Sequence, residues 1–191
     1  MSTQPVTRLT VEQYLEIERA AEFRSEYIDG EVYAMSGGSR NHALIAMAAG
    51  ARLDEQLRGR PCAVAGSDLR LFCKQANILT YPDIVVFCEP AEFLDGDEDT
   101  LTDATVIIEV LSRSTRDFDR GEKFRSYRGM PSFAEYILLA QDAIPAEHYV
   151  RQPDHSWLLR ELNRPDAELV LNSIGCRLNL GSLYERAKLA Q

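Results

Sequence analysis

The feature that most constrains this chain is a pair of strongly apolar segments that each contain one acidic residue. Segment 81–87 reads Tyr-Pro-Asp-Ile-Val-Val-Phe, and segment 106–111 reads Val-Ile-Ile-Glu-Val-Leu. β-Branched runs of this length, bounded by proline or polar residues, are typical of buried strands. Carboxylates are seldom buried unpaired, so Asp83 and Glu109 each require a cationic partner, a metal ion or solvent.

Two neighbouring strands that present one carboxylate each at the same end would form a site for a hard divalent cation, which prefers oxygen ligands. Two other interpretations stay open. Asp83 could cap the start of its strand, and Glu109 could form a buried ion pair with Arg113 or Arg116. The occurrence of both acids in one pattern favours metal ligation for each.

A helix is expected over 116–129, because glycine and proline at 129 and 131 are common after the end of a helix. Helical spacing predicts one face that carries Arg116, Arg120, Lys123 and Tyr127. Such a helix could direct Lys123 at the two acids. Alternatively, Lys123 could form an exposed pair with Asp119, four residues earlier, worth about 0.2–0.5 kcal/mol.

These residues carry a family resemblance. The segments 81–83, 108–116 and 119–123, with Tyr127 and the pair 135–136, resemble the Uma-two family of bacterial restriction-endonuclease-type proteins in the PD-(D/E)xK nuclease superfamily. Segment 24–38 and His42 also look like the opening hairpin and helix of that family, so the resemblance covers nearly the whole chain. It implies an α/β fold with a restriction-endonuclease-like mixed central β-sheet flanked by helices.

The resemblance also implies site residues. Asp83, Glu109 and Lys123 would be catalytic, and Mg²⁺, with Mn²⁺ as a substitute, would be held by both acids and the backbone carbonyl of Val110. The superfamily places its lysine two residues after the Glu, where this chain has Leu111. Lys123 resembles the relocated lysine that this family supplies from the following helix. DNA would be the substrate, contacted by Arg113, Arg116 and Arg120.

Two accessory residues are expected near this site. Segments 25–28 and 31–35 flank Asp29-Gly30, a strong hairpin signal, and either Glu26 or Glu31 could point to the metal, with Glu31 our candidate. His42 lies in the first turn of a helix predicted over 41–58 and could border the site. The simpler alternatives are a solvent-facing acid on a hairpin and a histidine that only caps its helix.

The remaining patterns complete the predicted architecture. Thr10 and Gln13 fit a capping box for a helix that ends near residue 21, and the stripe on helix 41–58 includes Ile45 and Ala51. Further strands are expected at 62–66, 68–72, 134–139, 147–151, 157–162 and 168–171, with a terminal helix over 182–189. We expect one domain over 1–191 with a core at about 39–141, an N-terminal helix and hairpin, and a C-terminal antiparallel extension.

Charge and composition limit the function. The net charge of −9 argues against a nonspecific nucleic-acid binder, although segment 113–128 carries six basic residues against three acids. Segment 89–103 holds seven acids with no lysine or arginine and is expected to be a solvated loop. The four cysteines show no CxxC pairing and are expected to be reduced core residues. Neither a membrane-length apolar run nor a signal peptide is present, which predicts a cytoplasmic protein.

Together these features predict a Mg²⁺-dependent endonuclease that hydrolyses DNA and forms a homodimer, since a twofold assembly suits the cutting of two strands. The main alternative is a catalytically inactive nucleic-acid or protein-binding module with the same fold, favoured by Leu111 and by the acidic net charge. A metal-dependent hydrolase of a small phosphorylated substrate is a third class.

Overall fold

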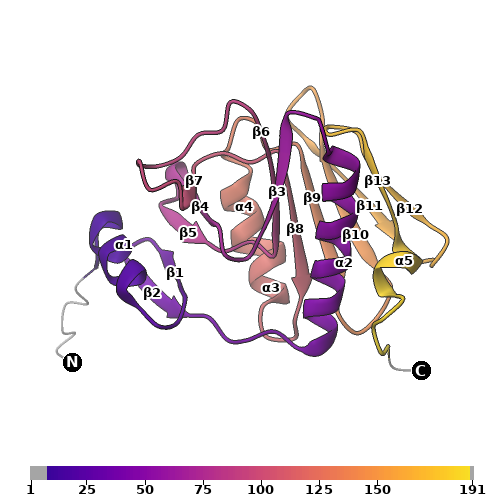
Figure 1. Cartoon of the computed structure of the whole chain (residues 1–191), viewed down its shortest axis with the longest axis horizontal. Coiled ribbons are helices and arrows are strands. Elements are labelled where there is room, and N and C mark those ends of the chain that lie inside the picture. Colours follow the sequence, from indigo (N-terminus) through magenta and orange to yellow (C-terminus); the bar gives the residue numbers. More distant parts are fainter. Residues whose placement is uncertain (1–7, 190–191) are drawn as a thin grey trace.

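A mixed six-stranded sheet forms the centre of the computed structural model, which describes residues 8–189 (Figure 1). Its order is β11-β10-β9-β8-β6-β3. Only β8 and β9 run parallel, and the other neighbours in this sheet are antiparallel. The strand bounds are β3 Cys62–Gly66, β6 Ile84–Cys88, β8 Val106–Leu111, β9 Glu135–Ala140, β10 Ala146–Arg151 and β11 Trp157–Leu162.

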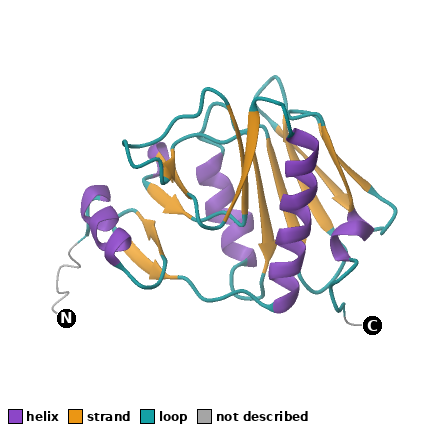
Figure 2. Cartoon of the chain, in the orientation of Figure 1, coloured by secondary structure: helices purple, strands orange, loops and turns teal. Residues whose placement is uncertain are grey.

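A second sheet lies toward the N-terminal end of the molecule, in the order β2-β1-β5-β4-β7 (Figure 2). Its strands are β1 Ser25–Ile28, β2 Glu31–Ala34, β4 Arg70–Cys73, β5 Ile78–Thr80 and β7 Thr100–Leu101, with a 3₁₀ turn at Lys74–Ala76. The β1-β2 turn has positive φ at both Asp29 and Gly30, as the predicted two-residue hairpin requires. Helix α1 (Val11–Ala20) carries the expected Thr10–Gln13 capping box.

One face of the central sheet packs against α2 (Arg40–Leu57), β12 (Glu168–Leu171), β13 (Cys176–Asn179) and α5 (Leu180–Tyr184). The buried residues of α2 are Ile45, Ala49, Leu53 and Leu57, which recur every four positions and form one stripe. Ala51 was expected in that stripe but is exposed, because it lies two positions from both Ala49 and Leu53 and therefore on the opposite side of the helix.

The opposite face packs against a helix built in three pieces: α3 (Arg116–Phe118), a π-helical turn at Asp119–Lys123 and α4 (Phe124–Tyr127). Residues along β8 alternate between the two faces, with Ile108 and Val110 toward α2 and Ile107 and Leu111 toward α4. Glu109 shares the α4 face, where it receives a hydrogen bond from Tyr127. The strand period therefore directs this acid at the helix that carries Lys123.

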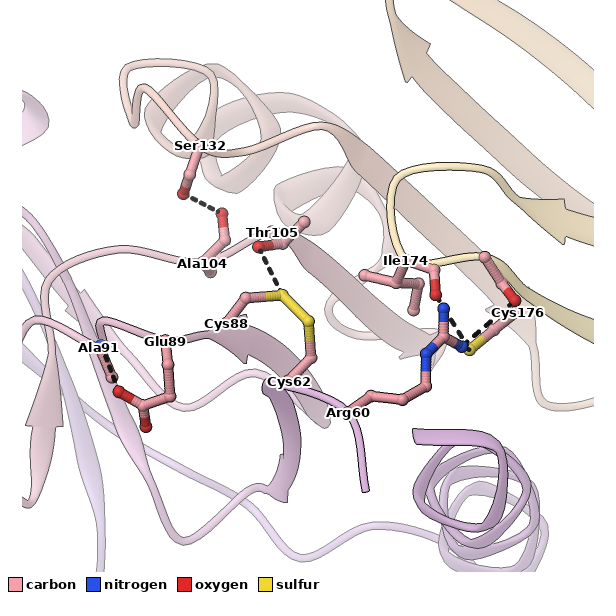
Figure 3. Close-up of a disulfide and its surroundings, with 11 residues drawn as sticks. Arg60, Cys62, Cys88, Glu89, Ala91, Ala104, Thr105, Ser132, Ile174 and Cys176 are labelled. Carbon is pink, nitrogen blue, oxygen red and sulfur yellow. Dashed lines mark hydrogen bonds between the residues drawn. A yellow bond between two sulfur atoms is a disulfide. The ribbon is translucent and has the colours of Figure 1, made fainter. Parts of the chain in front are cut away.

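The prediction of four reduced cysteines was wrong for two of them. Cys62 and Cys88 form a disulfide between the antiparallel strands β3 and β6, in which these residues are directly opposite (Figure 3). Cys73 and Cys176 are free and buried, as expected. The pairing was not recognisable along the chain because the two partners are 26 residues apart and become neighbours only through strand register.

The acidic segment 89–103 was also expected to be a solvated loop, but it is partly ordered by α1. Arg19 pairs with Asp95, Asp97 and Asp99, and the buried Arg70 also pairs with Asp99. The cations that balance this segment thus come from outside it. The mixed α/β architecture with an N-terminal hairpin and a C-terminal antiparallel extension is confirmed. Within residues 8–189, the helices are too short or too polar to cross a membrane.

Candidate active site

Asp83 and Glu109 lie next to each other where β6 begins and β8 approaches its end. The Asp83 amide donates to Glu109 Oε2 at 3.1 Å, and the Val110 amide donates to Asp83 Oδ2 at 2.7 Å. Antiparallel pairing of β6 and β8, which aligns Ile84 with Ile108, produces this approach. The structure thus brings together the two acids that the sequence singled out, which are 26 residues apart.

Lys123 reaches the same place from the π-helical turn. Its Nζ lies 3.3 Å from Glu109 Oε1, 3.3 Å from Asp119 Oδ1 and 3.0 Å from Glu26 Oε1. The pair with Asp119 exists at the expected spacing, but both side chains are buried rather than exposed. Single π turns occur frequently at functional sites, and here the turn spans Asp119 to Lys123. Glu109 pairs with Lys123, not with Arg113 or Arg116.

Acidic side chains outnumber basic ones in this cluster, and this excess shifts the pKa values of Glu109 and Lys123. Burial raises the pKa of Glu109 to about 8, with a downward pull from Lys123 and upward contributions from Asp83 and Asp119. Burial alone would lower the pKa of Lys123, but Glu109, Glu26 and Asp119 together raise it well above its ordinary value. The ammonium is therefore retained as a cation among carboxylates that repel one another.

His42 borders the site from the first turn of α2. Its Nε2 lies 3.1 Å from Asp83 Oδ2, and this hydrogen bond raises the pKa of His42 against the opposing effect of burial. Ser39 caps the same turn by accepting from the His42 amide. Gly38 leaves room for the imidazole, since a Cβ there would lie 2.8 Å from His42 Nδ1. His42 is thus a capped helix residue whose side chain also contacts the site.

The hairpin contributes Glu26 to the site, not Glu31. Glu31 lies on the exposed strand β2 and accepts a hydrogen bond from the Tyr33 hydroxyl, whereas Glu26 is largely buried against Lys123. The candidate accessory residue was therefore the wrong one of the two. Alternation along β1 was the available signal, because Ser25 and Tyr27 are buried on the side away from the pocket.

Tyr127 also belongs to the site, although no role there was expected from the sequence. Its hydroxyl lies 3.1 Å from Glu109 Oε1, to which it donates, and 2.9 Å from the hydroxyl of Thr80. Burial, followed by the nearby Glu109 charge, raises its pKa well above the ordinary value. Its position four residues after Lys123, one helical turn away, was the signal that could have identified it.

Of the three arginines expected to contact DNA, helical spacing placed Arg116 and Arg120 on one face with Lys123. In the structure neither arginine shares the buried face of Lys123. Arg113 and Arg116 are exposed, and Arg113 lies at the rim of the pocket. Arg120 is exposed as well, but its guanidinium lies 2.6 Å from Glu147. The buried positions of this segment are Asp119 and Lys123 in the π turn and Phe124, Ser126 and Tyr127 in α4.

The positions of Leu111 and Lys123 show how a lysine on the helix can take the place of a lysine at position 111 of β8. Leu111, where the resemblance to the nuclease superfamily would place a lysine, is buried among the residues that pack against α4. Glu109 and Leu111 are two residues apart on one strand, so they face the same side of the sheet. A helix that covers this side can supply an ammonium to the space that a lysine at 111 would reach.

A cavity of about 800 Å³ is lined by the charged residues of the site and by the start of the following helix: Glu26, His42, Asp83, Glu109, Asp119, Lys123, Ser112, Arg113, Ser114 and Thr115. A second hollow, of about 820 Å³, extends along α2 toward Phe23 and Met47. The two hollows share the segment 35–38 as well as His42 and Asp83. Asp83 therefore lies where they meet.

The donor set fits a magnesium ion with few protein ligands. In the described part of the chain, no group of three or more His, Cys, Asp or Glu side chains is arranged to hold a metal. Mg²⁺, however, is often held by one or two carboxylates together with waters, and Asp83 and Glu109 are such a pair. Glu26, Glu109 and Asp119 surround the single Lys123 ammonium, and this excess of carboxylates is compatible with a bound divalent cation.

Comparisons with known proteins identify relatives of this chain. Residues 11–181 match the model of the Uma2 (Uma-two) family, described as "Putative restriction endonuclease". The uncharacterised protein slr1290 of Synechocystis is 33% identical over 94% of this chain and 93% of its own length. The uncharacterised protein sll1609 of the same organism is 35% identical over 84% of this chain and 91% of its own.

A solved structure shares the fold. The crystal structure of a "putative nuclease belonging to DUF820" from Anabaena variabilis superposes with a TM-score of 0.75, covering 93% of this chain and 98% of that one, at 20% sequence identity. The family match spans both strands that carry the acids and the helix that carries Lys123. By sequence and by fold, this chain belongs to the Uma2 family of restriction-endonuclease-type proteins.

Proposed function

We propose that this protein is a Mg²⁺-dependent endonuclease that hydrolyses DNA phosphodiester bonds. The observation that carries the proposal is the convergence of Asp83, Glu109 and Lys123 in one pocket. Glu109 is buried and Asp83 is largely buried beside it, and two such carboxylates repel each other unless a cation compensates them. Lys123 supplies one positive charge, which leaves the cluster with net negative charge for a divalent ion to balance.

Each residue has a role in the proposed reaction. Asp83 and Glu109 would hold Mg²⁺, or Mn²⁺ in its place, with the carbonyl of Val110 as a further ligand. Such an ion would supply a coordinated water of lowered pKa and positive charge beside the phosphoryl oxygens. Lys123 orients the attacking water and stabilises negative charge at phosphorus through preorganised electrostatics.

The shape of the site favours a polymeric substrate. Two hollows meet at Asp83, so a chain can continue on both sides of the reacting phosphate, which a small phosphorylated compound would not need. Arg113 lines the first hollow, and the exposed Arg113 and Arg116 are the cations available to the DNA backbone. Arg120 contributes less, since Glu147 already neutralises it. We further propose that the protein forms a homodimer, which would provide one active site for each strand of a DNA duplex.

Plasmid cleavage tests the proposal directly. With Mg²⁺ we expect cleavage that EDTA abolishes, and a decrease of at least about 100-fold in Asp83→Ala, Glu109→Ala and Lys123→Ala. The matched controls are Glu31→Ala and Lys74→Ala, which remove exposed charges of the same sign and should cut like the wild type. Cleavage without metal, or full activity after removal of either acid, would contradict the mechanism.

A noncatalytic module is the second candidate, because Leu111 occupies the superfamily's lysine position. Electrophoretic mobility shifts with Ca²⁺ in place of Mg²⁺ separate the two candidates. DNA binding without cleavage under any metal would favour the module. Cleavage that depends on Lys123 would favour the enzyme.

A further inference from the structure

The N-terminal hairpin contributes a third acidic side chain to the pocket. Along β1, Ser25 and Tyr27 are buried, and Tyr27 packs with Tyr14 of α1. The alternate residues, Glu26 and Ile28, line the pocket. The strand period thus fixes Glu26 on the side of Lys123.

Glu26 makes the shortest of the three carboxylate contacts to Lys123, at 3.0 Å compared with 3.3 Å for both Glu109 and Asp119. Its Oε1 is buried, and no donor among residues 8–189 offers it a hydrogen bond of good geometry. The contact with Lys123 is therefore an ion pair whose Coulomb attraction compensates the burial of the acid. Removing Glu26 would take away the nearest counter-charge of the ammonium.

A second buried carboxylate fixes the position of Glu26 relative to the metal-binding strand. Glu18 of α1 accepts hydrogen bonds from the amide and hydroxyl of Ser25, the residue before Glu26. Glu18 also accepts from the Tyr81 hydroxyl at 2.8 Å, and Tyr81 lies two residues before Asp83. One side chain therefore ties the hairpin that carries Glu26 to the chain segment that carries Asp83.

We propose that Glu26 is a positioning residue that holds the Lys123 ammonium beside Glu109. This inference rests on the proposed nuclease function. Without Glu26 the ammonium keeps Glu109 and Asp119, and Asp119 belongs to the same helical turn as Lys123, so it can follow any reorientation of the lysine. Displacement of a reacting group by about 1 Å can lower a rate by about 100-fold. Glu26 therefore acts on the rate through Lys123 and does not bind the metal.

Glu26→Gln tests this role, since it keeps the size of the side chain and removes its charge. Glu31→Gln is the matched control, because Glu31 lies in the same hairpin but is exposed and bonded to Tyr33. We expect the single-turnover cleavage rate of Glu26→Gln to fall by about 10- to 100-fold. Mn²⁺ affinity, measured by electron paramagnetic resonance titration, should stay close to the wild-type value. A parallel loss of Mn²⁺ affinity would make Glu26 a metal ligand and overturn the positioning role.

A second readout does not depend on cleavage. An ordered, buried ammonium gives a ¹H–¹⁵N cross-peak by NMR, and the Lys123 signal is assigned by its loss in Lys123→Met. This cross-peak should broaden or disappear in Glu26→Gln and persist in Glu31→Gln. An unchanged cross-peak in Glu26→Gln would overturn the proposal, even if the wild type cuts DNA. Absence of cleavage by the wild type would instead refute the nuclease function, and the cross-peak would still decide whether Glu26 holds Lys123.

If Glu26→Gln does not fold, Glu26→Asp replaces it, because aspartate keeps the charge and is one methylene shorter. A displaced Lys123 cross-peak together with a slower cleavage rate would support the positioning role. Wild-type values for both would overturn it.

Discussion

Lys123 and Glu109 lie on different elements, yet the Lys123 Nζ is 3.3 Å from Glu109 Oε1 and both side chains are buried. The strand carries the acid on the face that the helix covers, so packing of the two elements creates the pair. Glu26 and Asp119 surround the same ammonium. The pair is thus the centre of a compact charged cluster.

Lys123→Met should destabilise the protein, because it leaves Glu26, Glu109 and Asp119 without their shared cation. Removing one partner of a buried ion pair typically lowers the free energy of unfolding by about 3–5 kcal/mol. Urea unfolding at pH 8 should show this loss, and a smaller loss at acidic pH, where Glu109, whose pKa is raised to about 8, is protonated. Lys74→Met, at an exposed position, is the control. Equal stability of the wild type and Lys123→Met at pH 8 would mean that solvent already screens the cluster.

Tyr127→Phe should lower the free energy of unfolding by about 1–3 kcal/mol, because the buried Thr80 hydroxyl loses its partner and Glu109 loses a donor. Tyr33→Phe removes an exposed hydroxyl that bonds only to Glu31 in the described structure and should change stability little. Urea unfolding of both variants makes the comparison. Equal values for the two would indicate that water replaces the Tyr127 hydroxyl.

The buried pair Glu135–His148 should make the free energy of unfolding depend on pH in the acidic range. Burial alone would raise the pKa of Glu135, but hydrogen bonds from His148 and Ser173 outweigh it and lower the pKa below 4.5. A lowered folded-state pKa stabilises the protein above about pH 4.5, and that contribution is lost as the pH falls through the folded value. Glu135→Gln should therefore be less stable than the wild type at pH 7 and should lose less on acidification.

Unfolding curves at pH 7 and at pH 4 measure this difference. Glu161→Gln, an exposed acid on β11, is the control and should retain the wild-type pH dependence. An identical acid dependence in Glu135→Gln and the wild type would refute the assignment to Glu135.

Thiol titration should find two free thiols in the denatured, unreduced protein and four after reduction, because Cys62 and Cys88 are joined and Cys73 and Cys176 are not. Reduction should also lower the free energy of unfolding by about 2–4 kcal/mol, since the crosslink restricts the unfolded chain. A Cys62→Ser/Cys88→Ser double variant is the control and should not respond to the reductant. Four reactive thiols before reduction would show that the disulfide does not form.

The local sequence was sufficient for most of the secondary structure and for the two central acids. Strand β8 matches its predicted bounds. Asp83 and Glu109 were identifiable because a carboxylate inside an apolar segment needs a partner when that segment is buried. The hairpin turn at Asp29-Gly30 was equally clear, since only a few residue pairs accept positive φ. These are signals that a segment carries by itself.

The sequence alone therefore determined which segments become strands and helices, and which acids need a partner. The tertiary structure decided the partners: Glu26 and not Glu31 meets Lys123, Arg120 is neutralised by Glu147, and Cys62 meets Cys88. Side-chain period and turn chemistry act over a few residues, so they are visible in the sequence. Contacts between residues far apart depend on strand register and helix packing, which only the folded chain fixes.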